Sequence, residues 1–487
     1  MLFRSGVSVP STGLNPNLLL DYDRFCSDSA CAFAQEQTRL VRSAAGRGQW
    51  ITTNLFPPPL SNAIDMEGMT EGMDFASWDN YPVWGDQDTP LPWQFNATAQ
   101  TYVRGLRDNV PFTVMEEMSG FQGHTCLGHL PSEKQVALWA VQTIARGANR
   151  ILFFRWRTAT LGQEQLCYGL LDADNKETER FRVLTATMRR AEAELSGIAS
   201  VRTANPACLV YSKDDARLLQ RQYQSKGLLM NVGANGNAGY DLELATWFAP
   251  FVTLGTGTDI ASARSLKPEA YKVISLPLYQ MADAQLVRKL AAWVEAGGTL
   301  ILGYRTGTRD TGNSATGLEL PGLFGDLAGI TVPRFESLNE GSAKLRIGLI
   351  PARGKVWADI IEPGSASPVA FWSDRSKFYR GKPAVTVNTV GLGKVWYIGT
   401  SPDPVASLLL YRRILREAGL EPRFTGTAIE SVPRVDESGT RYRLVLNHSS
   451  RNRRACGAKL GPWDWALVPD RRLERLARKN RAPQTDA

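Results

Sequence analysis

The sequence contains no apolar run of about 18 residues, the length at which a segment becomes a candidate to cross a bilayer. We therefore expect no transmembrane helix and no membrane partner. The N-terminal stretch, residues 1–10, has no long apolar core and does not look like a secretory signal peptide. These absences favour a protein of the cytoplasm.

Cysteine is scarce and scattered along the chain. The six thiols belong to Cys26, Cys31, Cys126, Cys167, Cys208 and Cys456. No Cys-x-x-Cys pair occurs, so a zinc site is poorly supported, and we expect neither a metal nor another cofactor. Disulfide frameworks are typical of small secreted domains, whereas this chain has 487 residues. The cysteines are therefore expected to be reduced.

Acidic residues are too few to balance the basic ones, and the formal net charge is +8. Much of the excess lies in two basic runs, at 451–454 and 471–481. Nucleic-acid binding is one interpretation of such runs. Because no interleaved aromatic residues accompany them, we expect no nucleic-acid partner, and we interpret residues 471–487 as a solvated basic tail.

A regular alternation of strands and helices is present in residues 1–200. Strands are expected at 50–54, 73–78, 110–116 and 149–156, and helices at 22–45, 93–108, 132–147 and 176–196. Polar or aromatic residues stand at the C-terminal end of each strand, where (β/α) barrels place their active sites. A complete barrel needs eight strands and about 250 residues, however, so this segment predicts only half of one.

The strand that enters at Val110 ends in two adjacent carboxylates, Glu116 and Glu117, followed by the turn signal Ser119-Gly120. A catalytic carboxylate at a barrel strand end is one interpretation, and a solvated acidic loop after an ordinary strand is the other. Side chains alternate along a strand, so the two glutamates should point to opposite sides. They cannot form one catalytic pair, and Glu117 is expected to be a surface or supporting carboxylate.

Other strand ends carry candidate binding residues. Asp79 and Tyr81 follow the 73–78 strand, and Trp156 is the last residue of the 149–156 strand. Each of these side chains could line a site, or it could pack the top of the barrel without a functional role. His124 could act as a base, although a loop histidine without function is the commoner case.

A second unit is predicted at 205–420 and a small β-domain at 425–470. The second unit has buried strands at 207–211, 273–277 and 299–303, and helices at 242–249 and 282–296, the first with Asp241 as its N-cap. This pattern predicts a doubly wound α/β domain. Its Gly255–Thr258 segment is too short for a nucleotide-binding fingerprint.

Six blocks together resemble the glycoside hydrolase family 42 β-galactosidases, in the order in which they occur there. The blocks are Asn15–Phe25, Thr52–Asn54, Ser77–Pro82, Met115–Gly120, Phe153–Thr158 and Gly162–Asp172. The resemblance implies a retaining hydrolase of terminal β-D-galactosyl residues, acting on a galactoside or galacto-oligosaccharide. It also implies that the second unit is a flavodoxin-like or amidotransferase-like domain that makes a homotrimer.

Carried over residue by residue, the resemblance makes Glu116 the nucleophile. Glu164 matches the glutamate that hydrogen-bonds galactose in the family. Two departures weaken that pocket: His124 stands where a tryptophan is common, and Cys167 with Tyr168 replaces a histidine. A thiol is a poor hydrogen-bond donor, and an imidazole offers a smaller stacking face than an indole.

The four strands resemble the fifth to eighth strands of the family's barrel. The family's acid/base glutamate follows an asparagine on the fourth strand, and no Asn-Glu pair precedes Glu116. Glu36, Glu67 and Glu71 are poorly placed substitutes. The expected fold is therefore the C-terminal half of a (β/α)8 TIM barrel, followed by the α/β trimerisation domain and a small β-domain. An N-terminal half-barrel is an expected partner.

Three functions remain open from the sequence. The chain is a family 42 β-galactosidase or the C-terminal part of one. Alternatively, it is an inactive truncated fragment or pseudoenzyme in which only the oligomerising domain is intact. A third alternative is a related barrel glycosidase with another sugar specificity, such as an α-L-arabinopyranosidase.

Overall fold

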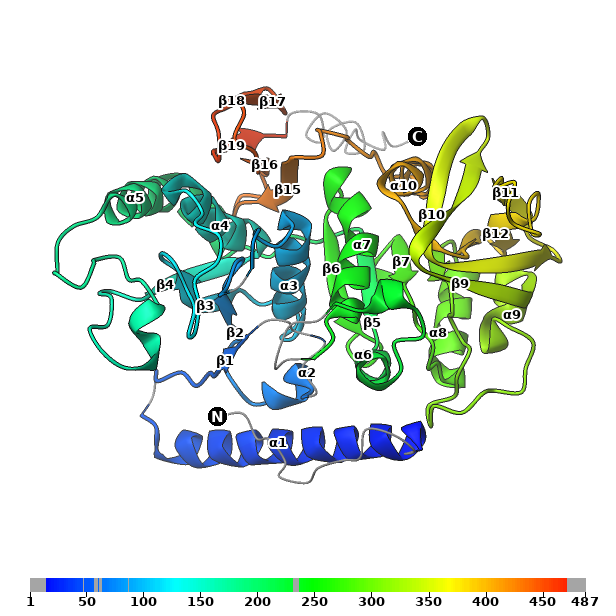
Figure 1. Cartoon of the computed structure of the whole chain (residues 1–487), viewed down its shortest axis with the longest axis horizontal. Coiled ribbons are helices and arrows are strands. Elements are labelled where there is room, and N and C mark those ends of the chain that lie inside the picture. Colours follow the sequence, from blue (N-terminus) through cyan, green and yellow to red (C-terminus); the bar gives the residue numbers. More distant parts are fainter. Residues whose placement is uncertain are drawn as a thin grey trace, which may run out of the picture.

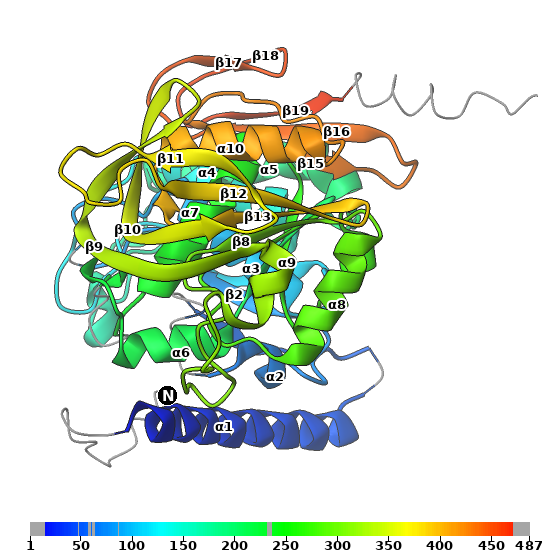
Figure 2. The ribbon, with the colours of Figure 1, turned by 90° about the vertical axis from the view of Figure 1, so that its right-hand side faces the viewer.

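A computed structural model describes residues 15–46, 48–56, 60, 64–85, 87–230 and 236–470. Two α/β units lie side by side, and the long helix α1 (Pro16–Ala44) runs beneath both of them (Figure 1). The C-terminal strands lie on the opposite side of the molecule from α1 (Figures 1 and 2). The expected tail at 471–487 and the expected loop at 1–14 lie outside the described residues.

The first unit is half of a (β/α)8 barrel, as the sequence predicts. Its sheet has four parallel strands in the order β1-β2-β3-β4. They are β1 (Asn54–Leu55), β2 (Ser77–Asn80), β3 (Phe112–Met118) and β4 (Ala148–Phe154). Among the described residues no strand joins β4 back to β1, so the sheet is an open arc. The expected strand at 50–54 is wrong in extent, because only Asn54 and Leu55 pair with β2.

Local sequence signals account for the helices of this unit. The helices are α2 (Met66–Met69), α3 (Trp93–Gly105), α4 (Glu133–Arg146) and α5 (Glu179–Ala199). Helix α4 begins where the hydroxyl of Ser132 accepts a hydrogen bond from the Gln135 amide, and it ends at Gly147, whose φ of 113° favours glycine. Thr178 caps α5 in the same way, through the Phe181 amide.

Helix α1 begins earlier than the predicted 22–45 segment because Asn15 caps it and Pro16 occupies its first turn. Its inner face contacts both units. On the barrel side, Ser27 Oγ accepts a 2.8 Å hydrogen bond from the Asp65 amide. On the other side, Arg24 and Asp23 form ion pairs with Asp214 and Arg221, at 2.6 and 2.8 Å. Its outer face exposes the large apolar side chains of Leu18, Phe25, Phe33, Leu40 and Val41.

The second unit is built on a ten-stranded mixed sheet. Its order is β14-β10-β9-β11-β12-β13-β8-β7-β5-β6. Five neighbouring strands are parallel: β5 (Ala207–Tyr211), β6 (Thr258–Ser262), β7 (Val273–Leu276), β8 (Thr299–Gly303) and β13 (Gly393–Ile398). Helices α7 (Gly239–Thr253) and α10 (Pro404–Glu417) pack on one face, whereas α8 (Ala284–Glu295) and α9 (Gly325–Ala328) pack on the other. The doubly wound prediction is confirmed for this parallel part.

The antiparallel part of that sheet is not among the predicted elements. It comprises β9 (Ile330–Ile347), β10 (Ile350–Pro363), β11 (Ser367–Trp372), β12 (Pro383–Val390) and β14 (Ser401–Pro402). Strands β9 and β10 form a long hairpin that turns at Gly348, where φ is 59°. The predicted N-cap Asp241 is also wrong: α7 begins after Ala238, and the Asp241 carboxylate instead accepts a 2.9 Å hydrogen bond from the Leu60 amide.

The C-terminal β segments pack against the first unit. Strands β15 (Ile429–Val435), β16 (Arg441–Asn447) and β19 (Trp465–Pro469) form an antiparallel sheet, and β17 (Arg453–Ala455) pairs with β18 (Ala458–Leu460). Apolar side chains of this sheet, including Leu444 and Trp465, share a core with α4 and α5.

One apolar core crosses the boundary between the two units. It joins Trp78 and Phe112 of the half-barrel to Leu209 and Trp247 of the second unit, with Tyr102 of α3 between them. Burial of side chains of this size contributes roughly 1.5–3 kcal/mol each. The two units are therefore fixed to each other by packing and not only by the chain that links them.

Candidate active site

The carboxyl end of β3 directs its two glutamates to opposite sides. Glu117 is fully buried, and its two oxygens accept hydrogen bonds of 3.1 and 3.0 Å from Asn80 Nδ2. Asn80 in turn accepts from Gln100 of α3. Glu117 therefore faces the helices as a supporting carboxylate and not as a surface residue, and burial raises its pKa well above the ordinary range.

Glu116 lies on the other side of the strand and is half-buried. The hydroxyl of Tyr81 donates a 2.6 Å hydrogen bond to its Oε2. The amide of Asn54 approaches its Oε1 at 3.5 Å, at the limit of a hydrogen bond. The strand ends of β1, β2 and β3 thus converge on one accessible carboxylate, which is the geometry that a barrel-top nucleophile requires.

Asp79 neighbours Glu116 in the register between β2 and β3 and is 7% exposed. Its Oδ1 accepts a 2.9 Å hydrogen bond from Asn54 Nδ2. Burial, and secondarily the charge of Glu116, raise the pKa of Asp79 to about 8. Asp79 is therefore largely protonated at pH 7. Burial also raises the pKa of Tyr81, followed by its hydrogen bond to Glu116, so its hydroxyl remains a donor.

Aromatic rings surround this centre. The Trp84 ring lies 5.0 Å from Tyr81 and 5.1 Å from the exposed His124, and it meets both edge-on. His124 therefore stands near the site through its contact with Trp84. Trp84 is not among the residues singled out from the sequence, and Asn54 appears there only as part of the Thr52–Asn54 block. The only signal for Trp84 is its position just after Tyr81-Pro82, at a strand end.

The remaining predicted residues lie around the β4 end. Glu164 forms a 3.1 Å ion pair with Arg155, and 46% of its side chain is exposed. Trp156 is 59% exposed and packs edge-on against Phe181 of α5, an arrangement that matches the barrel-top packing alternative. Cys167 is buried, and burial raises the pKa of its thiol.

The three other glutamates considered from the sequence are engaged away from the site. Glu36 pairs with Arg39 on α1, and Glu71 accepts from Gln35. Glu67 pairs with Arg264 at 3.2 Å. Within the described residues no group of three or more His, Cys, Asp or Glu side chains could hold a metal ion. In that same part of the chain, no helix is long and apolar enough to cross a membrane.

Two family models match the chain. One, described as "Beta-galactosidase", matches residues 6–193. The other, described as "Beta-galactosidase trimerisation domain", matches residues 205–421. The first model ends within α5, and the second begins just before β5, where the sequence predicts the second unit to begin.

Individual relatives agree with these matches. The chain is 31% identical over 456 residues to β-galactosidase BgaA of Clostridium cellulovorans, covering 92% of this chain and 66% of the relative. It is 28% identical to β-galactosidase Bga of Halorubrum lacusprofundi, covering 83% of this chain and 59% of the relative. This chain thus spans 59–66% of the length of those two relatives.

Solved structures show the same architecture. The β-galactosidase from the Antarctic haloarchaeon Halorubrum lacusprofundi matches with a TM-score of 0.83 at 25% identity, over 95% of this chain and 69% of that one. The cold-adapted β-galactosidase from Rahnella sp. R3 also gives a TM-score of 0.83, at 21% identity, over 93% of this chain and 68% of that one. The second likeness bears on the fold alone.

Proposed function

Because this chain belongs to the glycoside hydrolase family 42 β-galactosidases, we propose that it carries the nucleophile side of a retaining β-galactosidase site. The observation that supports this most directly is Glu116, which is half-buried at the end of β3 with the hydroxyl of Tyr81 bound to it at 2.6 Å. The substrate is a terminal β-D-galactosyl group of a galactoside or galacto-oligosaccharide.

In a retaining glycosidase one carboxylate attacks the anomeric carbon, and a second carboxyl group about 5–5.5 Å away protonates the leaving oxygen. Glu116 is the nucleophile in this proposal. Tyr81 and Asn54 hold its two oxygens in place for attack. Asp79, which is largely protonated at pH 7, adds little negative charge next to Glu116 and can donate a hydrogen bond to a sugar hydroxyl.

Glu164 and the aromatic pair of Trp84 and His124 complete the proposed sugar pocket. Glu164 keeps an exposed carboxylate that can accept from galactose hydroxyls while Arg155 fixes its position. Trp84 supplies an indole next to His124, where the family commonly has a tryptophan. Trp156, packed on Phe181, belongs to the outer wall.

The acid/base glutamate is absent from the surroundings of Glu116 in the part of the chain that the structure describes. Asp79, which neighbours Glu116 in the register between β2 and β3, is only 7% exposed and is poorly placed to protonate a leaving group. General acid catalysis typically contributes about 10²–10⁴-fold, because without it the leaving alkoxide must depart unprotonated. We therefore expect the 487-residue chain to be a poor lactase, with a smaller deficit on activated aryl galactosides.

An N-terminal half-barrel is the proposed partner that supplies this acid. Two features support it. The sheet of the first unit ends at β1 and β4, and Leu152 on β4 is 49% exposed. On α1, Leu18, Phe25 and Phe33 expose between 55% and 66% of their surface. Open sheet edges and contiguous apolar helix faces are uncommon in monomers, because both promote association.

Residues 205–420 are proposed to form the main contact of a homotrimer, as the matched trimerisation model suggests. The trimer would persist even if the catalytic unit were inactive. An inactive chain that only oligomerises is the second candidate function. Size-exclusion chromatography with light scattering on the full chain tests it: a trimer is expected, and a monomer at high concentration would contradict it. We further propose a cytoplasmic location, because all six cysteines are free.

The nucleophile assignment is tested by adding a 2-fluoro-galactoside with an activated leaving group to the 487-residue chain and locating the label by peptide mass spectrometry. The label should appear on Glu116 and be absent from Glu116→Gln. The matched variant Glu117→Gln should still be labelled. A label on Glu117 would overturn the assignment, and labelling by an arabinopyranoside in preference would favour the alternative sugar specificity.

A further inference from the structure

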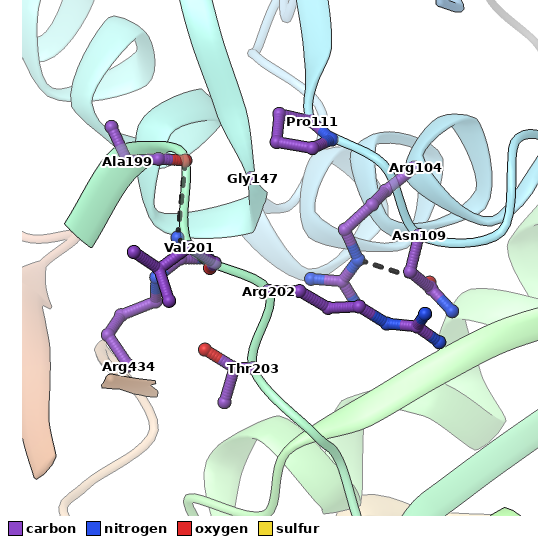
Figure 3. A pocket seen from close by; sticks show the side chains of 9 residues that line it. All are labelled: Arg104, Asn109, Pro111, Gly147, Ala199, Val201, Arg202, Thr203 and Arg434. Carbon is purple, nitrogen blue, oxygen red and sulfur yellow. Dashed lines mark hydrogen bonds between the residues drawn. The ribbon is translucent and has the colours of Figure 1, made fainter. Parts of the chain in front are cut away.

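A small opening lies where the half-barrel, the segment after α5 and strand β15 meet. It opens to solvent, and its enclosed space is close to that of a single water-sized sphere. Three arginines line it from three separate parts of the chain: Arg104 from α3, Arg202 from the linking segment and Arg434 from β15 (Figure 3). Its lining includes Pro111, which precedes β3, but none of the site residues described above.

Arg434 is the unusual member of this group. It is 4% exposed, yet no carboxylate lies within ion-pair distance of it among the described residues. Its Nη2 donates to the carbonyl oxygens of Ile198, Ala199 and Val201 at the end of α5. Its Nε has no hydrogen-bond partner in that same part of the chain. A buried cation with an unused donor is costly unless something else pairs with it.

The neighbouring charges do not provide that partner. Arg104 is paired with Asp259 at 2.6 Å, and Arg146 is paired with Glu430. Asp259 also accepts a 2.7 Å hydrogen bond from Asn205, so its Oδ1 is already shared. Three buried arginines thus face two buried carboxylates, and one positive charge remains.

The pKa of Arg434 reflects the same excess of positive charge. Burial, followed by repulsion from Arg104 and Arg146, lowers the pKa of Arg434 to about 9. The carbonyls at the end of α5 offer partial negative charge, but they occupy only Nη2. The Nε side is the side on which charge is left uncompensated.

A second unused polar atom lines the same opening. The hydroxyl of Thr203 is buried and has no hydrogen-bond partner in the described structure. Figure 3 shows this hydroxyl on the side of Thr203 that faces Arg434. Arg202, which is exposed, also lines the opening, but Figure 3 shows its side chain extending toward Asn109 and away from Arg434. Two unused donors beside a buried positive charge are the elements of an anion site.

We propose that this opening binds a small inorganic anion, held by Arg434 Nε and the Thr203 hydroxyl. An ordered water could accept the same hydrogen bonds, but it would leave the buried charge uncompensated. Because Arg434 belongs to β15 whereas Thr203 follows α5, the bound anion would fasten the C-terminal sheet to the half-barrel. Anion binding should therefore raise the stability of the folded chain.

The proposal is tested by thermal unfolding of the full chain in rising concentrations of sodium bromide or sodium sulfate. General salt effects are removed by comparing Arg434→Met with Arg441→Met, which removes an exposed arginine from the neighbouring strand β16. The midpoint should rise and saturate in the wild type and in Arg441→Met, and this saturating rise should disappear in Arg434→Met. An equal rise in both variants would overturn the proposal.

Crystals of the full chain provide a measurement that does not depend on the folding of Arg434→Met. Grown in bromide, they should show an anomalous peak within hydrogen-bonding distance of Arg434 Nε. Tetrahedral density there from sulfate crystals, without a bromide peak, would identify an oxyanion site instead. Water alone at that position in both crystals would overturn the proposal. A peak confined to the exposed Arg202 would do so too, because it would indicate an adventitious ion only.

Discussion

The hydroxyl of Tyr81, at the end of β2, donates a 2.6 Å hydrogen bond to Oε2 of Glu116, at the end of β3. A hydrogen bond to a charged acceptor is stronger than one between neutral groups, and this one fixes the carboxylate in a single orientation. The Asn54 amide, at the end of β1, approaches the other oxygen at 3.5 Å, so each oxygen of Glu116 faces a donor from another strand end. These two contacts hold the carboxylate in place within the protein itself.

Tyr81→Phe should therefore slow the reaction of Glu116. The ring and its contact with Trp84 are kept, and only the donor is lost. A hydrogen bond to a charged group contributes about 1.5–3 kcal/mol, so labelling of Glu116 by an activated 2-fluoro-galactoside should be at least about tenfold slower. Tyr223→Phe, at an exposed position, is the control. Equal labelling rates in the two variants would show that Tyr81 does not position the carboxylate.

Asp79→Asn should change how stability depends on pH. In the folded chain the pKa of Asp79 is raised from 3.8 to about 8, so the folded state keeps a proton that the unfolded state loses. Stability from this group is present at low pH and is lost as the pH rises from about 4 to about 8.

The free energy of unfolding of the wild type should thus fall relative to Asp79→Asn across that range, by an amount on the order of a few kcal/mol. Denaturant unfolding at a series of pH values measures it. If the free energies of unfolding of the two proteins differed by a constant amount from pH 4 to pH 8, Asp79 would be ionised throughout that range and the prediction would be wrong. Glu116→Gln should make the wild-type trend shallower, because the charge of Glu116 contributes to the raised pKa.

Glu430→Gln should destabilise the docking of the C-terminal sheet on the half-barrel. Glu430 is fully buried and accepts from Arg146 of α4, from Gln142 and from His448. Breaking a buried ion pair by removing one partner typically costs about 3–5 kcal/mol, because the other charge stays buried. Urea unfolding should record a loss of that order, whereas the exposed Glu437→Gln should lose less than about 0.5 kcal/mol.

The double variant Phe25→Ser/Phe33→Ser should reduce self-association of the chain beyond its main oligomer. Both rings are more than half exposed on the outer face of α1, so their removal costs little packing. Light scattering at rising protein concentration should show less aggregate than the wild type. Leu349→Ser is the control, because Leu349 is 95% exposed but lies on the distant β9–β10 turn. Equal aggregation in all three proteins would contradict a role for the α1 face.

The sequence predicts the parallel strands well and the antiparallel ones poorly, for a physical reason. Strands 207–211 and 299–303 are buried on both faces and form continuous apolar runs, so their predicted and observed bounds agree. Strands β9 and β10 are long and carry many exposed polar residues, because much of each strand lies outside the core. Their pairing depends on register with each other and not on local composition.

The candidate site, too, can be predicted from the sequence only in part. Strand alternation predicts that Glu116 and Glu117 face apart, and the structure places them so. Alternation cannot predict that Glu117 is buried. Its burial depends on Asn80 of β2, which is itself bound by Gln100 of α3, and both residues come from other elements of the fold. Asn54 likewise reaches Glu116 from a different strand, and no local pattern announces such a contact. The roles of Glu116 and Glu164 remain predictions until labelling and assay test them.

An apolar core joins Trp78 and Phe112 to Leu209 and Trp247, so the two units should unfold together as one cooperative unit. A calorimeter should record a single endotherm, and amides in β3 and β5 should exchange through the same global opening. If either unit were removed, the other would expose the apolar side chains of this shared core to water. Selection for stability should therefore retain both units. The unit that contains Glu116 would be kept for its packing even if its catalytic activity were lost.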